Sequence, residues 1–169
     1  MFTTAKSQFS LSNTDSQWQI GATAIGQGNT VISPIHAAML VSAIANGGTL
    51  MKPYVIDSVQ STEGSVIEQY ESENYGTLMS ASESSQLTKM MKAVVEEGTG
   101  YKLSGKNYSV AGKTGTAEVV GRGNNAWFVG FAPADDPKIA ICVLVEDAGT
   151  ASSEAVPIAG EILDAYLNN

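Results

Sequence analysis

The chain has 169 residues, with nine Lys and Arg against seventeen Asp and Glu, and its formal net charge is −8. This length is enough for one domain with a hydrophobic core, and a hydrophobic fraction of 43% excludes an intrinsically disordered chain. The basic residues are scattered along the sequence, which argues against nucleic-acid binding. No apolar run is long enough to span a membrane, and no signal segment is evident at the N-terminus.

The single cysteine and the single histidine give no spacing suited to a metal site, and we expect no cofactor. Cys142 lies in the apolar run "KIAICVLVE", so it is predicted to be a small buried side chain rather than a reactive thiol. His36 lies near the start of an apolar segment, and we predict a structural role for it.

The N-terminal part of the chain is predicted to contain one buried helix. Residues 1–19 are polar without a period and indicate an irregular lead-in. A Ser-Pro pair at 33–34 is a strong helix start, and residues 35–45 are apolar on nearly all sides, so we expect a deeply buried helix. The Asn-Gly-Gly at 46–48 ends it. The preceding "IGQG" at 25–28 is predicted to be a loop packed against this helix.

The middle of the chain predicts a hairpin and a second helix. Residues 54–60 and 65–70 are short β-rich runs separated by a turn. Ser80 and Glu83 fit a capping box, and Gly98 ends the helix that follows. The apolar stripe of this helix consists of Leu87, Met90, Met91, Val94 and Val95.

The C-terminal part predicts three strands and a final helix. The strands are expected at 109–120, 126–132 and 138–146, and the tight turns between them indicate an antiparallel meander. The third strand is apolar on both faces, so it is predicted to be an inner strand covered on two sides. The final helix is expected to start near Ser152 or Ser153. Its predicted apolar stripe is Ala159, Ile162, Leu163, Tyr166 and Leu167.

These elements predict an α+β fold, with an antiparallel sheet of three C-terminal strands and helices packed on it. Three strands make a small sheet with two open edges, and a strand that is apolar on both faces needs layers above and below. We therefore expect residues 1–169 to be part of a larger domain, with an exposed apolar face that favours self-association.

The stretch "VAGKTGTAEVV" places unusual residues on the first of these strands. Side chains alternate along a strand, so Lys113 and Gly115 are predicted to face one way and Thr114 and Thr116 the other. Gly115 has no side chain, so an extended peptide can approach and pair with the strand edge. Hydroxyls and an ammonium group suit an anionic ligand such as a terminal carboxylate, and an outward N–H can stabilise an oxyanion.

With its neighbours, this motif resembles the C-terminal part of a penicillin-binding protein transpeptidase domain, most closely of the class B type. The segments "IGQG", "SPIHAAMLVSAIANGG", "GKTGTAE", "WFVGFAP" and "IAGEILDAY" are similar to the family in the same order, from about residue 19 to the end. The resemblance implies a peptidoglycan D,D-transpeptidase that cross-links stem peptides through a serine acyl-enzyme and binds β-lactams. It also implies a membrane-anchored parent at the extracytoplasmic face of a bacterial cell.

The family has three motifs, S-x-x-K, S-x-N and K-T-G, and only the last is credible here. None of the lysines has a serine three positions earlier. Ser72 and Asn74 match S-x-N by letters, but they follow "IGQG", whereas the family's motif precedes it. Covalent catalysis needs both the nucleophilic serine and its base, so we predict an inactive isolated chain whose partner is the missing N-terminal half of the domain.

The resemblance implies local roles for four residues. Lys113 would line the cleft as a fixed positive charge, and the hydroxyls of Thr114 and Thr116 would bind the substrate's terminal carboxylate. The Thr116 N–H would be half of the oxyanion hole, and Gly115 would provide backbone clearance.

Three further residues lie near the motif without a predicted catalytic role. The family often has histidine where Asn125 stands here, so a role for that histidine is in doubt. Glu118 and Arg122 are interpreted as surface or turn residues.

Three alternative functions remain at this point. The parent could be a β-lactam sensor or a serine β-lactamase, and "IGQG" with the long C-terminal match argues against the lactamase. The chain could also be a non-catalytic structural or docking module.

Overall fold

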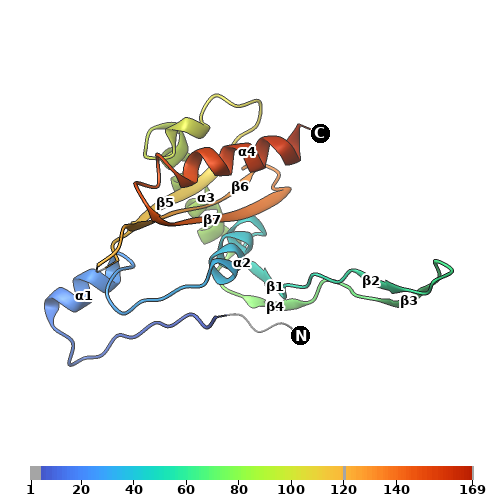
Figure 1. Cartoon of the computed structure of the whole chain (residues 1–169), viewed down its shortest axis with the longest axis horizontal. Coiled ribbons are helices and arrows are strands. Elements are labelled where there is room, and N and C mark those ends of the chain that lie inside the picture. Colours follow the sequence, from blue (N-terminus) through green and yellow to red (C-terminus); the bar gives the residue numbers. More distant parts are fainter. Residues whose placement is uncertain (1–4, 120, 169) are drawn as a thin grey trace.

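The computed structural model describes residues 5–119 and 121–168, which form an α+β body and a long two-stranded arm (Figure 1). The body is built on an antiparallel sheet of β5 (Ala111–Ala117), β6 (Asn124–Ala132) and β7 (Ile139–Ala148). The predicted fold class and the predicted meander are both confirmed.

The order of the strands is β5-β6-β7, so β6 is central and β7 lies at an edge of the described sheet. The prediction that the third strand is an inner strand is therefore wrong. Its apolar pattern has another cause, because helix α4 (Ala155–Leu167) packs on one face of the sheet and α2 (Pro34–Ala45) on the other (Figure 1). The prediction that β7 is covered on two sides is confirmed.

The main core lies between the sheet and α4. Phe128 of β6 and Leu163 of α4 are both fully buried in it. Gly112 lies opposite Gly130 in the pairing of β5 with β6, and a Cβ atom added to Gly112 would lie only 2.3 Å from the Phe128 ring. The Phe128 ring thus occupies the space where a side chain at residue 112 would stand.

Helix α4 begins at Ala155, two residues or more after the predicted start. Ser152 and Ser153 lie in the preceding turn, where the Ser153 hydroxyl bonds to Thr150. The apolar stripe is also only partly as predicted: Ala159 and Leu163 are buried, but Ile162 and Tyr166 are exposed, and Gly160 is buried instead. A Cβ atom added to Gly160 would lie 3.0 Å from Leu103, so the segment before β5 approaches the helix closely at this residue.

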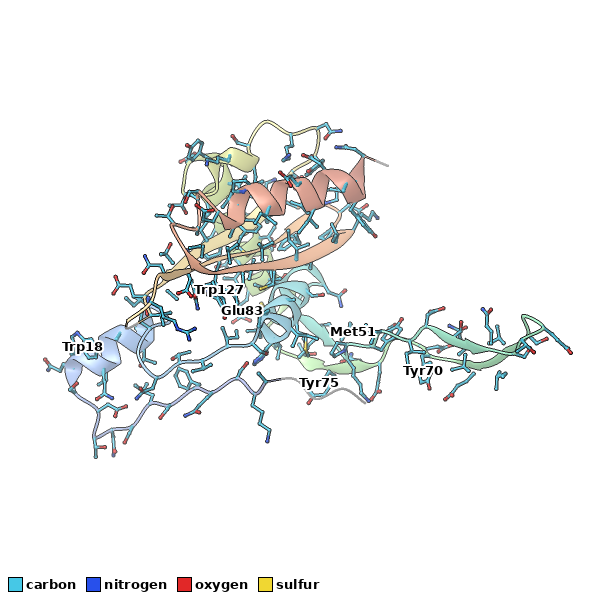
Figure 2. The ribbon with its side chains drawn as sticks, viewed as in Figure 1. Trp18, Met51, Tyr70, Tyr75, Glu83 and Trp127 are labelled. Carbon is cyan, nitrogen blue, oxygen red and sulfur yellow. The ribbon has the colours of Figure 1, made fainter. Side chains whose placement is uncertain are left out.

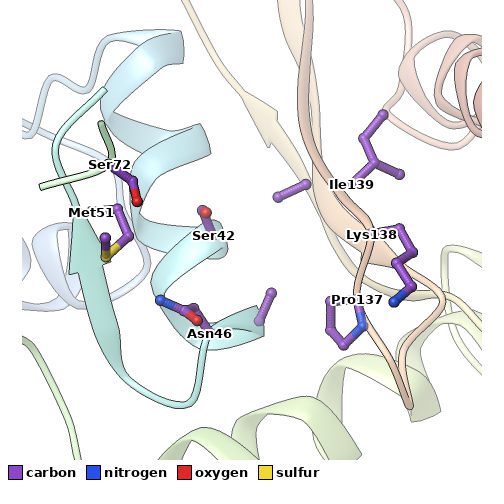
Figure 3. Close-up of a pocket in the computed structure, with 9 residues that line it drawn as sticks. Ser42, Asn46, Met51, Ser72, Pro137, Lys138 and Ile139 are labelled. Atoms are coloured by element: carbon purple, nitrogen blue, oxygen red, sulfur yellow. The ribbon is translucent and has the colours of Figure 1, made fainter. Parts of the chain in front are cut away.

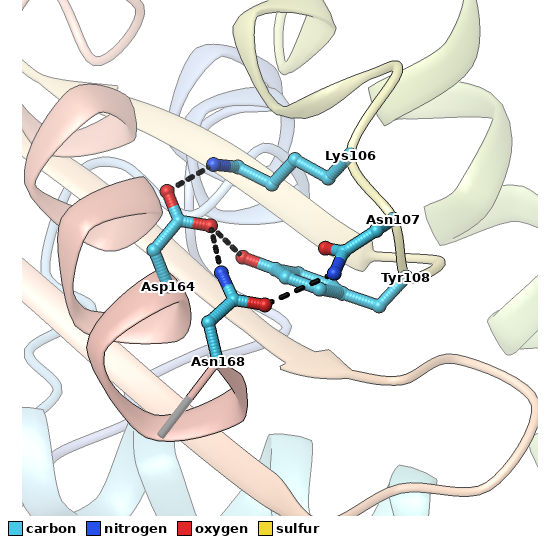
Figure 4. Close-up of polar contacts among 5 residues, drawn as sticks. All are labelled: Lys106, Asn107, Tyr108, Asp164 and Asn168. Atoms are coloured by element: carbon cyan, nitrogen blue, oxygen red, sulfur yellow. Dashed lines mark hydrogen bonds and ion pairs between the residues drawn. The ribbon is translucent and has the colours of Figure 1, made fainter.

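A polar cluster ties the end of α4 to the loop that precedes β5 (Figure 4). The carboxylate of Asp164 accepts hydrogen bonds from Lys106 Nζ at 2.5 Å and from the Tyr108 hydroxyl at 2.7 Å. Both hydrogen bonds lower the pKa of Asp164, and the bond from Lys106 has the larger effect. Burial and the Asp164 hydrogen bond raise the pKa of Tyr108. The cluster therefore favours an ionised Asp164 and a protonated Tyr108, and each of these groups stabilises the other.

Helices α2 and α3 (Ala81–Glu96) cover the opposite face of the sheet, with α3 packed against β5 and α2 against β7 and β6. The Ser33 hydroxyl accepts from the His36 N–H, and the capping box of Ser80 with Glu83 is present, so both predicted helix starts are confirmed. A smaller core joins the helices to the sheet. It consists of Val41, Met91, Ala111, Phe131 and Ala134.

The prediction that the helix at 35–45 is deeply buried is only partly right. Ala37, Val41 and Ala43 are its buried residues, whereas Leu40 is 36% exposed and His36 is exposed. The apolar surface around α2 has no covering layer among the described residues over part of its length. On α3, Met91 and Val95 are buried, but Met90 is 58% exposed for the same reason.

The N-terminal segment contains a helix that we did not predict. Helix α1 (Gln17–Ala24) begins after Ser16, whose hydroxyl accepts from the Gln19 N–H, so the irregular lead-in predicted for 1–19 is wrong at its end. Residues 1–4 lie outside the described residues. Helix α1 buries none of its residues, and its Trp18 is 76% exposed (Figure 2). The helix therefore has no buried apolar face, and hydrophobic periodicity does not indicate it in the sequence.

The arm consists of residues 52–73 and extends away from the body (Figure 1). At its base, β1 (Thr49–Met51) pairs with β4 (Asn74–Thr77), a pairing that we did not predict. In the arm itself, β2 (Ser58–Gln60) pairs with β3 (Val66–Gln69), which confirms the hairpin.

Candidate functional site

The K-T-G motif lies on β5, at the edge of the sheet opposite to β7. Lys113 is exposed, and its ammonium donates to the carbonyl of Thr114 at 2.7 Å. The Lys113 side chain borders a hollow of about 490 Å³ between α2 and α3, which is otherwise lined by apolar residues that include Leu40, Met90 and Val129. A cation therefore stands at the rim of an apolar depression.

Gly115 and Thr116 line a second, larger hollow of about 730 Å³. Its other wall is the "IGQG" segment, and Gln27 Nε2 donates to the carbonyl of Thr116 at 3.4 Å. Trp127 of β6 also lines this hollow. A Cβ atom added to Gly115 would lie 3.4 Å from Trp127 Cβ, an ordinary contact, so the fold tolerates a small side chain at this position.

The hydroxyls of the two motif threonines are held by other elements. Thr114 is only 8% exposed, and its Oγ1 lies 2.5 Å from Oγ1 of Thr99. Thr116 Oγ1 accepts from the backbone N–H of Ala151 at 3.2 Å, in the turn before α4. The Ser152 hydroxyl donates to the Thr99 carbonyl at 2.8 Å and so links the two supports.

The four predicted site residues are thus not gathered in a single pocket. Lys113 borders the hollow between α2 and α3, Gly115 and Thr116 line the next hollow along β5, and the Thr114 hydroxyl is turned toward Thr99. Lys113, Gly115 and Thr116 lie along the outer edge of β5, where an extended ligand would meet them in turn, whereas the Thr114 side chain is buried against Thr99.

Sequence reasoning did not identify Thr99, Ala151 and Ser152 as neighbours of the motif. They lie in loops, and no pattern in the sequence links them to β5. Gln27 lies in a segment that the sequence analysis singled out, but its contact with Thr116 spans 89 residues of chain.

The residues near the far end of β5 take ordinary positions. Glu118 is exposed on the wall of the larger hollow, and Arg122 is exposed in the turn before β6. Asn125 lines the same hollow, and its Oδ1 accepts from the Asp147 N–H at 3.4 Å. Cys142 is half-buried on β7, and burial raises the pKa of its thiol, which disfavours the reactive thiolate.

Ser72 and Asn74 lie elsewhere. Ser72 lines a separate hollow between the C-terminal end of α2 and the start of β7, opposite Lys138 and Ile139 (Figure 3). Asn74 begins β4. Neither residue lines the hollows beside β5.

Neither a cluster of metal ligands nor a membrane-spanning helix is present among the described residues. No group of three or more His, Cys, Asp or Glu side chains within 5–119 and 121–168 could hold a metal ion. In the same part of the chain, no helix has the length and apolar character needed to cross a membrane.

Comparison with protein families places this geometry in a known context. Residues 3–164 match the model of the penicillin binding protein transpeptidase domain. The chain is 34% identical over 157 residues to the peptidoglycan D,D-transpeptidase PbpA of Mycolicibacterium smegmatis, covering 88% of this chain and 32% of that protein. It is 38% identical over 152 residues to the stage V sporulation protein D of Bacillus subtilis, covering 83% of this chain and 23% of the relative.

Solved structures agree with this result. The imipenem acyl-enzyme complex of penicillin-binding protein A from M. tuberculosis superposes with a TM-score of 0.86 at 31% identity, over 96% of this chain and 37% of that one. The chain therefore spans about a third or less of the length of these relatives. Sequence and structure agree that the chain belongs to the family of penicillin-binding protein transpeptidase domains.

Proposed function

We propose that this chain forms the substrate-binding wall of a peptidoglycan D,D-transpeptidase domain, with β5 as the strand along which a stem peptide lies. The observation that carries the proposal is the hollow of about 730 Å³ beside the free edge of β5, bounded by Gly115 and Thr116 on one side and by Gln27 on the other. An open strand edge beside a cleft is a ready partner for an extended peptide.

The motif residues have distinct parts in this proposal. Lys113 supplies a fixed positive charge next to the reacting groups, and Gly115 leaves room for the peptide backbone. The hydroxyl of Thr116 donates to the terminal carboxylate of the substrate and its N–H stabilises the oxyanion, while the buried Thr114 hydroxyl holds this part of β5 in place through Thr99.

The nucleophile comes from the remainder of the domain, because the 169 residues contain no S-x-x-K sequence. In the whole protein, the serine oxygen attacks the penultimate D-alanine carbonyl and the terminal D-alanine leaves as the amine. An amine of a neighbouring stem peptide then attacks the acyl-enzyme and releases the serine. Two structural relatives are acyl-enzyme complexes with imipenem and with penicillin G, and we propose that β-lactams acylate the same serine here.

The remainder of the domain is therefore the partner that this chain requires, and residues 1–169 are a portion of that domain. Unpaired groups at the β7 edge and the apolar hollow beside α2 offer surfaces to receive it. We place the assembled protein at the extracytoplasmic face of the membrane, where its substrate is found.

Fluorescent penicillin tests this proposal. We expect no covalent labelling of the isolated chain, and labelling when it is co-expressed with the S-x-x-K-bearing remainder of its parent. Labelling of the isolated chain would refute the assignment of the nucleophile. Cross-linking by the parent, rather than slow release or fast hydrolysis of the drug, separates a transpeptidase from a sensor or a lactamase.

A further inference from the structure

The arm is the part of the molecule that the proposed transpeptidase function leaves unexplained. Every residue from 52 to 73 is exposed except Ser58 and Ser61, which are intermediate. The two halves of the arm are nevertheless joined by backbone hydrogen bonds, such as Lys52 N to Glu73 O at 2.8 Å and Tyr70 N to Asp57 O at 2.8 Å. Two-stranded ribbons are marginally stable alone in water, so a structured arm of this kind is suited to be completed by a partner.

The apolar side chains of the arm are unusually exposed for a solvated hairpin. Val55 is 74% exposed, Ile67 is 69% exposed and Val66 is 56% exposed. Glu68 lies opposite Val59 across the ribbon and shares a face with Tyr70, whereas the register shift between Val59 and Gln60 sets Val66 opposite Gln60. The Tyr70 hydroxyl donates to the Glu68 carboxylate, which raises the pKa of Tyr70 and places these two side chains together.

The charge of the arm is strongly negative. Residues 52–73 contain five acidic residues and one lysine, a net charge of −4, which is half of the −8 carried by all 169 residues. The single lysine, Lys52, is already paired with Glu73 at 2.8 Å. Glu68 and Glu71 thus stand on or next to β3 without a basic neighbour in the arm.

The edge of β3 has no strand partner among the described residues other than β2. An unpaired edge presents backbone N–H and C=O groups that an extended chain can bind. Apolar side chains beside acidic ones favour an added strand that alternates apolar and basic residues, because opposite charges across a strand pair stabilise it.

We propose that the arm is a docking site for an extended, lysine- or arginine-containing segment of a separate protein, which adds to β3 as a third strand. A second copy of the arm is a poor partner, because its own −4 charge would place like charges together. An anionic membrane surface would repel the arm for the same reason. The proposal does not depend on the transpeptidase activity.

The test uses the isotopically labelled chain and a synthetic peptide of alternating lysine and valine. We expect amide shifts concentrated at residues 66–70 and binding that weakens with added salt. The double substitution Glu68→Gln and Glu71→Gln should weaken binding by about fivefold to tenfold, since two exposed charge pairs with the peptide are lost and each contributes only modestly. A peptide of alternating glutamate and valine should leave the arm unshifted.

A matched control separates docking from general attraction to an acidic protein. Glu96 and Glu161 are exposed acids on α3 and α4, outside the arm, and their double change to glutamine removes the same charge. It should leave the affinity within about twofold of the unmodified chain. Equal weakening in both double variants, or no shift in the arm, would overturn the proposal. Concentration-dependent dimers that broaden the arm amides would instead assign the arm to self-pairing and would also overturn it.

Discussion

The two faces of the three-stranded sheet differ in how completely they are covered. On the α4 face, Phe128 and Leu163 are fully buried and the core is closed. On the face toward α2 and α3, Lys113 and Val129 border an apolar hollow of about 490 Å³. The difference teaches that one small sheet can supply a finished core on one side and a receiving surface on the other.

The order of the elements in the chain explains part of this difference in coverage between the two faces of the sheet. Helix α4 follows β7 in the chain and is tied to the loop before β5 by Lys106, Tyr108 and Asp164. Helices α2 and α3 cover the other face with a smaller buried cluster. The closed face should therefore carry most of the free energy of folding.

Truncation of Phe128 tests this directly and should have the largest effect. Phe128→Ala is expected to lower the free energy of unfolding by about 3–5 kcal/mol, because it removes a fully buried ring and leaves a cavity. Val129→Ala, on the open face, should cost about 1 kcal/mol or less, since Val129 is only partly buried. Urea unfolding measures both, and equal losses would contradict the comparison.

Two glycines on β5 sharpen the comparison within a single strand. Gly112→Ala should cost about 1–3 kcal/mol, because the new methyl group would overlap the Phe128 ring. Gly115→Ala should be neutral or stabilising by about 0.5 kcal/mol, since alanine suits a strand interior better than glycine and the space is free.

The Gly115→Ala substitution also separates an effect on folding from an effect on substrate binding. In the proposed parent transpeptidase, Gly115→Ala should slow acylation by penicillin while leaving unfolding unchanged. A parent whose acylation is unaffected would argue against peptide clearance as the role of Gly115.

Low pH should reduce the free energy of unfolding through Asp164, which ties α4 to the loop before β5. Its pKa is lowered in the folded chain by Lys106 and Tyr108, so the unfolded state takes up a proton first as the pH falls. The stabilisation is present above the ordinary aspartate pKa of about 3.9 and is lost as the pH drops through the lower folded value. Asp164→Asn should make unfolding stability less dependent on pH below about 4, as measured by urea titrations at several pH values.

Asp135 provides a comparison for this acid effect, because Ser109 and Lys92 lower its pKa in the same direction. Asp135→Asn should therefore remove a separate part of the same pH dependence. If neither substitution changes the slope, the acid loss has another origin.

Loss of the Thr99 hydroxyl should have only a small effect on folding. Thr99→Val is expected to change stability by less than about 1 kcal/mol, because Thr99 is exposed and one neutral hydrogen bond contributes little net. In the parent, however, it should slow penicillin acylation by up to about tenfold, because Thr114 would lose the partner that orients its hydroxyl. Thr99→Ser keeps the hydroxyl and should retain the rate.

Much of the fold followed from local signals in the sequence. The Ser33 cap, the capping box of Ser80 with Glu83 and the hairpin of β2 with β3 all have short-range causes, and the structure confirms them. Helix α1 was missed because it buries no residue, and a helix without a buried face shows no hydrophobic periodicity in its sequence. The pairing of β1 with β4 was missed because the strands are short and more than twenty residues apart.

The candidate site was predictable only in part. The motif at 113–116, its position on a strand and the alternation of its side chains could be derived from the sequence. Which groups support the Thr114 and Thr116 hydroxyls could not, because Thr99 and Ala151 lie in loops without a recognisable pattern.

The sequence by itself determined that an antiparallel meander carries K-T-G on its first strand, because turn residues and strand periodicity act locally. Only the tertiary structure decided that β6 rather than β7 is central, and that Gln27 reaches Thr116 across 89 residues. An apolar strand is compatible with helices or with strands as its neighbours. The choice between them is made by packing between distant segments, which leaves no trace in the local pattern.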